Sequence, residues 1–145
     1  MNRTTAREIA VQLLYSGSFD NVNLDEFFTE ENFKNLSLDC EFYNSKPGSK
    51  QTDYIRSVLD NYRCNAEEVD GIISRFSEKR AINRIPRTAL AVLRCAITEI
   101  LYIDDVPVGA AIDSAVEIDK GYDEEETVSF VNGVLGSFAR ELAGE

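Results

Sequence analysis

The sequence predicts an all-α fold of about seven helices in one domain that spans residues 1–145. Apolar residues recur at the three- and four-residue spacing of a helix along most of the chain. No segment alternates apolar and polar residues over more than a few positions, as a half-buried strand would. With 145 residues, of which 43% are hydrophobic and 28% charged, the chain is long enough to bury a core.

In the N-terminal half, turn and capping residues divide the helical pattern. Gly17 is expected to end the first helix, and the loop at 44–51 is centred on Pro47-Gly48. Thr52 is placed to cap the next helix, and Asn65 with Glu68 has the spacing of a capping box. Four segments show the helical pattern: residues 6–14, 24–28, 52–62 and 65–76.

In the C-terminal half, two prolines separate three further helices. Pro86 suits the first turn of a long apolar helix, which we expect to be central and buried. Pro107 ends that helix and opens the next one, whose inward face includes Ala111 and Ala115. Asp123 is positioned to cap the last helix, with Glu126 at its third position.

The Asn132-Gly133 pair raises a local question, because Asn-Gly between apolar residues usually marks a hairpin. Alternation fails here, whereas helical spacing puts six apolar residues on one face: Val128, Val131, Val134, Leu135, Phe138 and Leu142. The pair is therefore predicted inside a helix, at a cost of roughly 1.5 kcal/mol relative to Ala-Ala. Close approach of another backbone would explain Gly133. Phe130, at the edge of the apolar face beside Asn132, is a candidate base-stacking residue.

Charge is distributed unevenly along the chain. The net charge of −11 argues against non-specific attraction to nucleic acid. Residues 20–41 hold seven acids and one lysine, and residues 123–126 are four acids in a row. Residues 75–87 in contrast hold five of the 15 lysines and arginines against one acid. This basic segment is either a solvated surface or a landing site for phosphate.

Several classes of function lack support in the sequence. The three cysteines (Cys40, Cys64 and Cys95) have no CxxC spacing, and histidine is absent. We therefore expect reduced thiols, no metal site and no cofactor. No glycine-rich phosphate loop is present either, so catalysis is not expected. The sequence has no apolar run of membrane-spanning length and no secretory signal, which predicts a cytoplasmic protein that does not engage a membrane.

Four segments, in order, resemble one protein family. "FVNGVLGSFA" (130–139) resembles the C-terminal signature of the NusB transcription antitermination factors. "TAREIAVQLLY" (5–15) resembles their N-terminal helix, and "TALAVLRCAITEILY" (88–102) resembles their central helix. "VPVGAAIDSAVEIDKGYDEEETVSFVNG" (106–133) is similar to the stretch that leads into the signature. Together the four segments reach both ends of the chain and cover about half of its residues.

The resemblance implies two small packed helical bundles and a bacterial protein without catalysis. Members of the family pair with ribosomal protein S-ten (NusE) and bind boxA RNA in nascent transcripts, notably ribosomal RNA. With RNA polymerase and other Nus factors, they suppress termination. A monomer or a homodimer is expected. Similar domains also head RNA cytosine methyltransferases, but 145 residues leave no room for a catalytic domain of that kind.

The candidate binding residues come from this resemblance and from the basic segment. For RNA they are Arg3, Arg7, Phe76, Lys79, Arg80, Glu126, Phe130 and Asn132. For the protein partner they are Tyr15 and Phe130. Core roles for Phe76 and Tyr15, and a capping role for Glu126, remain open alternatives. Arg94 is expected to form an internal salt bridge, with Glu99 or another acid.

Two features depart from the family pattern. Asp113-Ser114 and Asp119 stand where Asn-Glu and Ala are commoner, and residues 18–51 are unusually acidic. The acidity favours an alternative function, a protein-interaction module of the same fold with little RNA binding of its own.

Overall fold

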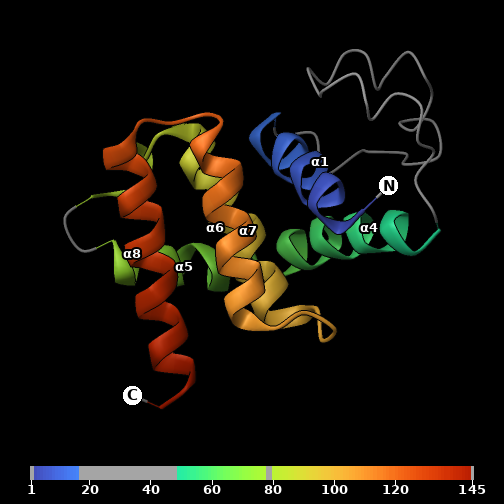
Figure 1. The fold of residues 1–145 in the computed structure, drawn as a ribbon. Coiled ribbons are helices and arrows are strands. Elements are labelled where there is room, and N and C mark those ends of the chain that lie inside the picture. The colour runs from blue at the N-terminus through green and yellow to red at the C-terminus, as the bar shows by residue number, and fades with distance from the viewer. Residues whose placement is uncertain (1, 17–48, 78–79, 145) are drawn as a thin grey trace.

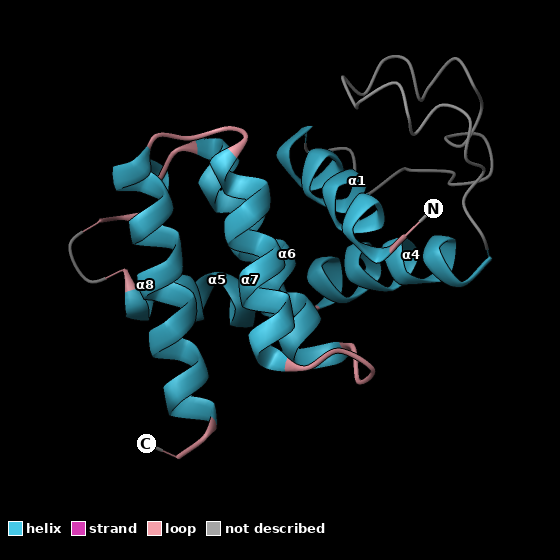
Figure 2. Cartoon of the chain, viewed as in Figure 1, coloured by secondary structure: helices cyan, strands magenta, loops and turns pink. Residues whose placement is uncertain are grey.

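The computed structural model describes residues 2–16, 49–77 and 80–144. Within these ranges it contains six α-helices, one 3-10 helix and no strand, which confirms the all-α prediction (Figure 2). The predicted helix at 24–28 and most of the acidic segment lie outside the described residues. The elements are α1 (Arg3–Ser16), α4 (Ser49–Cys64), α5 (Ala66–Phe76), η3 (Ile82–Arg84), α6 (Arg87–Tyr102), α7 (Val108–Lys120) and α8 (Glu125–Leu142).

Helix α6 is the centre of the molecule, as the sequence predicts. It packs against α1 and α4 on one side and against α5, α7 and α8 on the other, so that two small bundles share it (Figure 1). Its residues from Ala91 to Leu93 and from Cys95 to Glu99 are buried, and the run is interrupted only by Arg94. None of the helices in the described ranges is long and apolar enough to cross a bilayer.

Three predicted caps are wrong. Helix α4 begins at Ser49, so Thr52 lies within its first turn and residues 49–51 of the predicted loop are helical. Asn65 does precede α5, but its side-chain amide donates to the Asn61 carbonyl at 2.9 Å instead of capping. Helix α8 begins after Glu124, because the Asp123 carboxylate accepts the Thr88 hydroxyl at 2.7 Å. In the latter two cases another partner competes successfully for the capping side chain.

Asn132 and Gly133 lie inside the continuous helix α8, as the apolar spacing predicts. The predicted inward face is buried from Val128 to Phe138, whereas Leu142, at the end of the helix, is exposed. The predicted reason for Gly133 is wrong for the described chain. A Cβ atom built at Gly133 would meet no described atom within 4 Å, so no backbone packs closely there.

Replacing Gly133 with alanine is therefore expected to stabilise the isolated protein. The methyl group enters open space, and alanine exceeds glycine in helix propensity by about 0.8–1.0 kcal/mol. Urea denaturation would measure the gain in unfolding free energy. A loss of stability would mean that the surface of α8 at this position is covered in the folded protein.

Candidate nucleic-acid and partner interface

Arg80, Glu126 and Phe130 meet where the segment before η3 passes the start of α8. The guanidinium carbon of Arg80 lies 4.7 Å from the ring centroid of Phe130. Its Nη2 atom lies 3.8 Å from Oε1 of Glu126, whose side chain is 89% exposed. Glu126 and Phe130 are four residues apart and therefore lie on the same face of α8, one turn from each other. We call these three residues the α8 cluster.

Phe130 is half-buried on the edge of the inward face of α8. It packs partly against the hydrophobic core, and it is neither fully buried nor fully exposed. A cation over the face of the ring contributes about 0.5–1 kcal/mol at an exposed site. The ion pair of Arg80 with Glu126 is long and open to water, and such pairs contribute little. Arg80 is thus held over the ring by weak contacts that a phosphate group could replace.

Asn132 does not join this cluster. Residues two apart on an α-helix point in nearly opposite directions, about 200° apart, so Asn132 is not beside the ring of Phe130. The side chain is exposed on another part of α8. The two residues are close in sequence, but the helix turns their side chains to different faces, so the prediction that they lie side by side is wrong.

Phe76 lies where the end of α5 packs against α8. Its ring centroid is 6.2 Å from that of Phe138, a fully buried residue two turns beyond Phe130. Arg75 covers the other part of the Phe76 ring at 4.9 Å and forms an ion pair with Glu141. Phe76 is half-buried, and its contacts are those of a residue that joins α5 to α8.

Tyr15 and Arg87 join the end of α1 to the start of α6. The guanidinium carbon of Arg87 lies 4.9 Å from the Tyr15 ring centroid, and its Nη2 donates to the Tyr15 carbonyl at 3.0 Å. Tyr15 is nevertheless 43% exposed. The C-terminal end of α1 and the N-terminal ends of α6 and α8 lie at the same end of the molecule (Figure 1).

Arg3 and Arg7, predicted to form one basic face, have different environments. Arg3 lies over the Tyr54 ring at 4.3 Å, donates to Gln51 and pairs with Asp105 at 3.5 Å. These contacts are at the opposite end of α1 from Tyr15.

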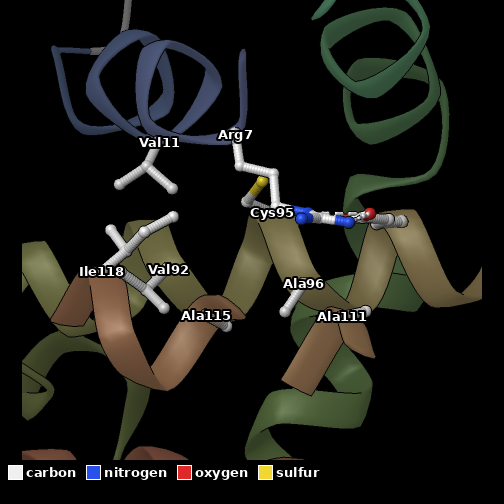
Figure 3. Close-up of a pocket in the computed structure, with 9 residues that line it drawn as sticks. Arg7, Val11, Val92, Cys95, Ala96, Ala111, Ala115 and Ile118 are labelled. Carbon is white, nitrogen blue, oxygen red and sulfur yellow. Dashed lines mark hydrogen bonds and ion pairs between the residues drawn. The ribbon is translucent and has the colours of Figure 1, made fainter. Parts of the chain in front are cut away.

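Arg7 is only 8% exposed, so it contributes little to a basic surface. Its Nη2 lies 2.6 Å from Oε1 of Glu99, and its Nε lies 2.9 Å from both carboxylate oxygens. Figure 3 shows Arg7 extending from α1 across the interior beside Cys95. The Tyr54 hydroxyl donates to the same carboxylate at 2.9 Å, and burial raises the pKa of Tyr54. Burial likewise raises the pKa of the Cys95 thiol to about 12.

Arg94 forms the internal salt bridge that the sequence predicts, and its partner is Asp70. The Nε and Nη2 atoms of Arg94 each lie 3.0 Å from one oxygen of Asp70. Glu99 could not serve, because residues five apart on a helix do not face each other. Lys79 lies outside the described residues.

One family of known proteins matches almost the whole of this chain in sequence. A sequence profile described as the NusB family matches residues 4–140, almost the whole chain. The chain belongs to the NusB family. It is 38% identical over 141 residues to the transcription antitermination protein NusB of Thermoanaerobacter sp. (strain X514), which covers 97% of this chain and 92% of the relative. The corresponding protein of Listeria monocytogenes serotype 4a is 32% identical, with 97% and 98% covered.

Solved structures agree with this assignment. A solved structure of T. maritima NusB superposes with a TM-score of 0.75 at 30% identity, covering 97% of this chain and 92% of that one. A complex of the antitermination factors NusB and NusE with double-stranded RNA contains a chain with a TM-score of 0.72 at 25% identity, and 96% of each chain is covered. The four segments that resemble the family lie on α1, on α6 and on α7 with α8.

Proposed function

We propose that this chain is a transcription antitermination factor that pairs with ribosomal protein S-ten (NusE) and binds boxA RNA in nascent transcripts, notably ribosomal RNA. With RNA polymerase and the other Nus factors, the complex suppresses termination. The likeness to a NusB chain crystallised with NusE and RNA supports this function. The α8 cluster, with an aromatic ring, a cation and an exposed carboxylate in contact, supports the position of the RNA site.

The chemistry of the α8 cluster suits single-stranded RNA. The part of the Phe130 ring that remains exposed offers a face on which a base stacks. Arg80 supplies the positive charge for a neighbouring phosphate, and exchanging its weak pair with Glu126 for that phosphate costs little. The freed carboxylate of Glu126 accepts hydrogen bonds from the amino groups of a base.

The partner surface is proposed at the end of the molecule where α1 and α6 meet. The exposed Tyr15 ring, held in place by Arg87, provides a rigid aromatic contact of the kind enriched at protein interfaces. Phe130 at the start of α8 completes this surface. The protein acts by binding alone, without a metal or cofactor, in the cytoplasm, as a monomer or homodimer.

The substitution Arg80→Glu tests the site of RNA binding. With NusE present, we expect weaker binding of boxA RNA and a smaller dependence of log K on log salt. If two to four phosphates are neutralised, the slope of the unmodified protein is roughly −1.4 to −2.8, and each lost contact removes about 0.7. Fluorescence anisotropy across a salt series measures both quantities.

Arg56→Glu is the matched control, because Arg56 is an exposed arginine of α4 in a comparable surface ion pair. It makes the same change of charge away from the α8 cluster and should leave the slope nearly unchanged. Equal slopes for Arg80→Glu and the unmodified protein would show that the basic segment is a solvated surface.

The net charge of −11 favours one alternative function, a module that binds NusE but contributes little to RNA binding. If the chain has that function, the α8 cluster contacts NusE and not RNA. The two functions differ in whether RNA affinity of the NusE complex depends on this chain.

A further inference from the structure

Asp119, in the last turn of α7, is a fully buried acid. Its exposed fraction is 0%, and neither carboxylate oxygen has a hydrogen-bond partner among the described residues. Burying an ionised carboxylate without compensation is strongly unfavourable. A native protein resolves this conflict by protonating the group or by supplying an opposite charge.

The group beside Asp119 is a second acid. Asp123, four residues on in the turn between α7 and α8, is the charged neighbour that, after burial, raises the pKa of the Asp119 carboxyl. The backbone amide of Asp123 also donates to the Asp119 carbonyl at 2.9 Å, which closes the turn. From the other side, the Thr88 hydroxyl in the first turn of α6 lies 2.7 and 2.9 Å from the two Asp123 oxygens.

The cations of the surrounding elements have other partners. On α6, Arg87 binds the Tyr15 carbonyl, and on α7, Lys120 binds Glu117 at 2.7 Å. Beside α8, Arg80 pairs with Glu126. The acids of the first turn of α8, Glu124 and Glu125, are exposed, and Glu8 of α1 accepts from the Tyr122 hydroxyl at 3.3 Å.

A metal ion is not favoured in place of a proton. No group of three or more metal-ligating side chains gathers anywhere in the part of the chain that the structure describes. Two carboxylates and one hydroxyl are few ligands for a hard cation, which takes six or more oxygens. A proton on Asp119 satisfies the pair with the atoms present.

We propose that Asp119 and Asp123 share one proton and, with Thr88, form a pH-sensitive latch that fastens the α7–α8 turn to the start of α6. Protonated Asp119 donates to ionised Asp123, and Asp123 also accepts from Thr88. When the proton leaves, two adjacent carboxylates repel each other, one of them buried, and the turn separates from α6. Because this turn leads into α8, the latch also fixes the first turn of that helix, on which Glu126 lies.

The direction of the pH dependence follows from burial. Burial first, and the neighbouring Asp123 second, raise the pKa of Asp119 from 3.8 to about 8. The folded protein therefore keeps a proton that the unfolded chain releases at lower pH. The stabilisation is complete below the unfolded pKa, declines as pH rises, and is lost as pH passes about 8.

Asp119→Asn tests the latch, because an asparagine amide can donate to Asp123 at every pH. The test needs no ligand. Melting temperatures would be measured from about pH 6 to about pH 9 for the unmodified protein and for this variant. We expect the unmodified protein to lose melting temperature toward high pH relative to Asp119→Asn. Asp113→Asn, an exposed acid on the same helix, should behave like the unmodified protein. The same pH dependence in all three proteins would overturn the proposal.

Two further measurements on the unmodified protein test the proposal even if the variant does not fold. Carboxyl carbon NMR should show one aspartate, Asp119, with a pKa far above the ordinary value, and normal titration of every aspartate would overturn the latch. Addition of Mg²⁺ or Ca²⁺ should leave the melting temperature unchanged. A rise that is absent in Asp119→Asn would show that a cation, and not a proton, joins the two acids.

Discussion

Replacing Arg7 with methionine is expected to lower the free energy of unfolding by about 3–5 kcal/mol. Arg7 and Glu99 form a buried pair with side-chain exposures of 9% and 1%, and the methionine would leave the Glu99 carboxylate in the core without its cation. The hydrogen bond from Tyr54 would remain but would not neutralise the charge. Urea denaturation at neutral pH gives the loss directly.

Two variants separate this effect from a general loss of packing. Arg3→Met removes an arginine one turn earlier on α1, whose pair with Asp105 is open to water, and should cost no more than about 1 kcal/mol. Adding Glu99→Leu to Arg7→Met removes the stranded charge and should recover much of the stability. A loss below about 1 kcal/mol for Arg7→Met would contradict the buried pair.

Replacing Phe130 with alanine is expected to weaken binding of boxA RNA by the NusE complex by about 1–3 kcal/mol while the fold stays intact. The ring is half-buried beside Arg80, so it retains a face for a base. RNA affinity and urea denaturation would be measured on the same variant.

Phe138→Ala is the matched control, because Phe138 lies two turns farther along α8 and is only 1% exposed. It should cost about 3–5 kcal/mol of stability, with normal RNA affinity for the molecules that remain folded. If Phe130→Ala gives the same pattern as Phe138→Ala, Phe130 is a core residue and contributes no stacking surface.

The helices of the described chain were predictable because burial imposes a repeating pattern on neighbouring residues. Along α8 the buried residues recur every third or fourth position, and that spacing can be recognised in the sequence without knowing which helix packs against it. The same spacing identified Asn132 and Gly133 as helical against a strong local signal for a turn. Burial of the apolar face of α8 outweighed the preference of Asn132 and Gly133 for a turn.

The residue that each polar side chain contacts was not predictable from the sequence. Asn65 and Asp123 have capping side chains, but Asn61 and Thr88 engage them, and Thr88 is 35 residues from Asp123. Arg7 is 92 residues from Glu99, and nothing in the sequence distinguishes it from the arginines at the surface. Such pairings depend on how the helices cross.

The residues of the candidate site were predicted individually, but their positions relative to one another were not. Glu126 and Phe130 came from the resemblance and Arg80 from local charge, and the structure brings all three together. Asn132 lies on another face, because adjacency in sequence is not adjacency on a helix. In the sequence Asp119 is only a departure from the family pattern and Asp123 only a predicted cap, because the relation between them depends on burial.

Titration of labelled boxA RNA with this chain alone, with NusE alone and with both proteins addresses RNA binding most directly. We expect weak binding by the chain alone, because its net charge is −11, and much tighter binding by the pair than by either protein. Arg80→Glu should reduce the affinity of the pair for boxA RNA without releasing NusE. If the pair forms but binds boxA RNA no more tightly than NusE alone, the chain is a protein-interaction module and the RNA site proposed on α8 does not exist.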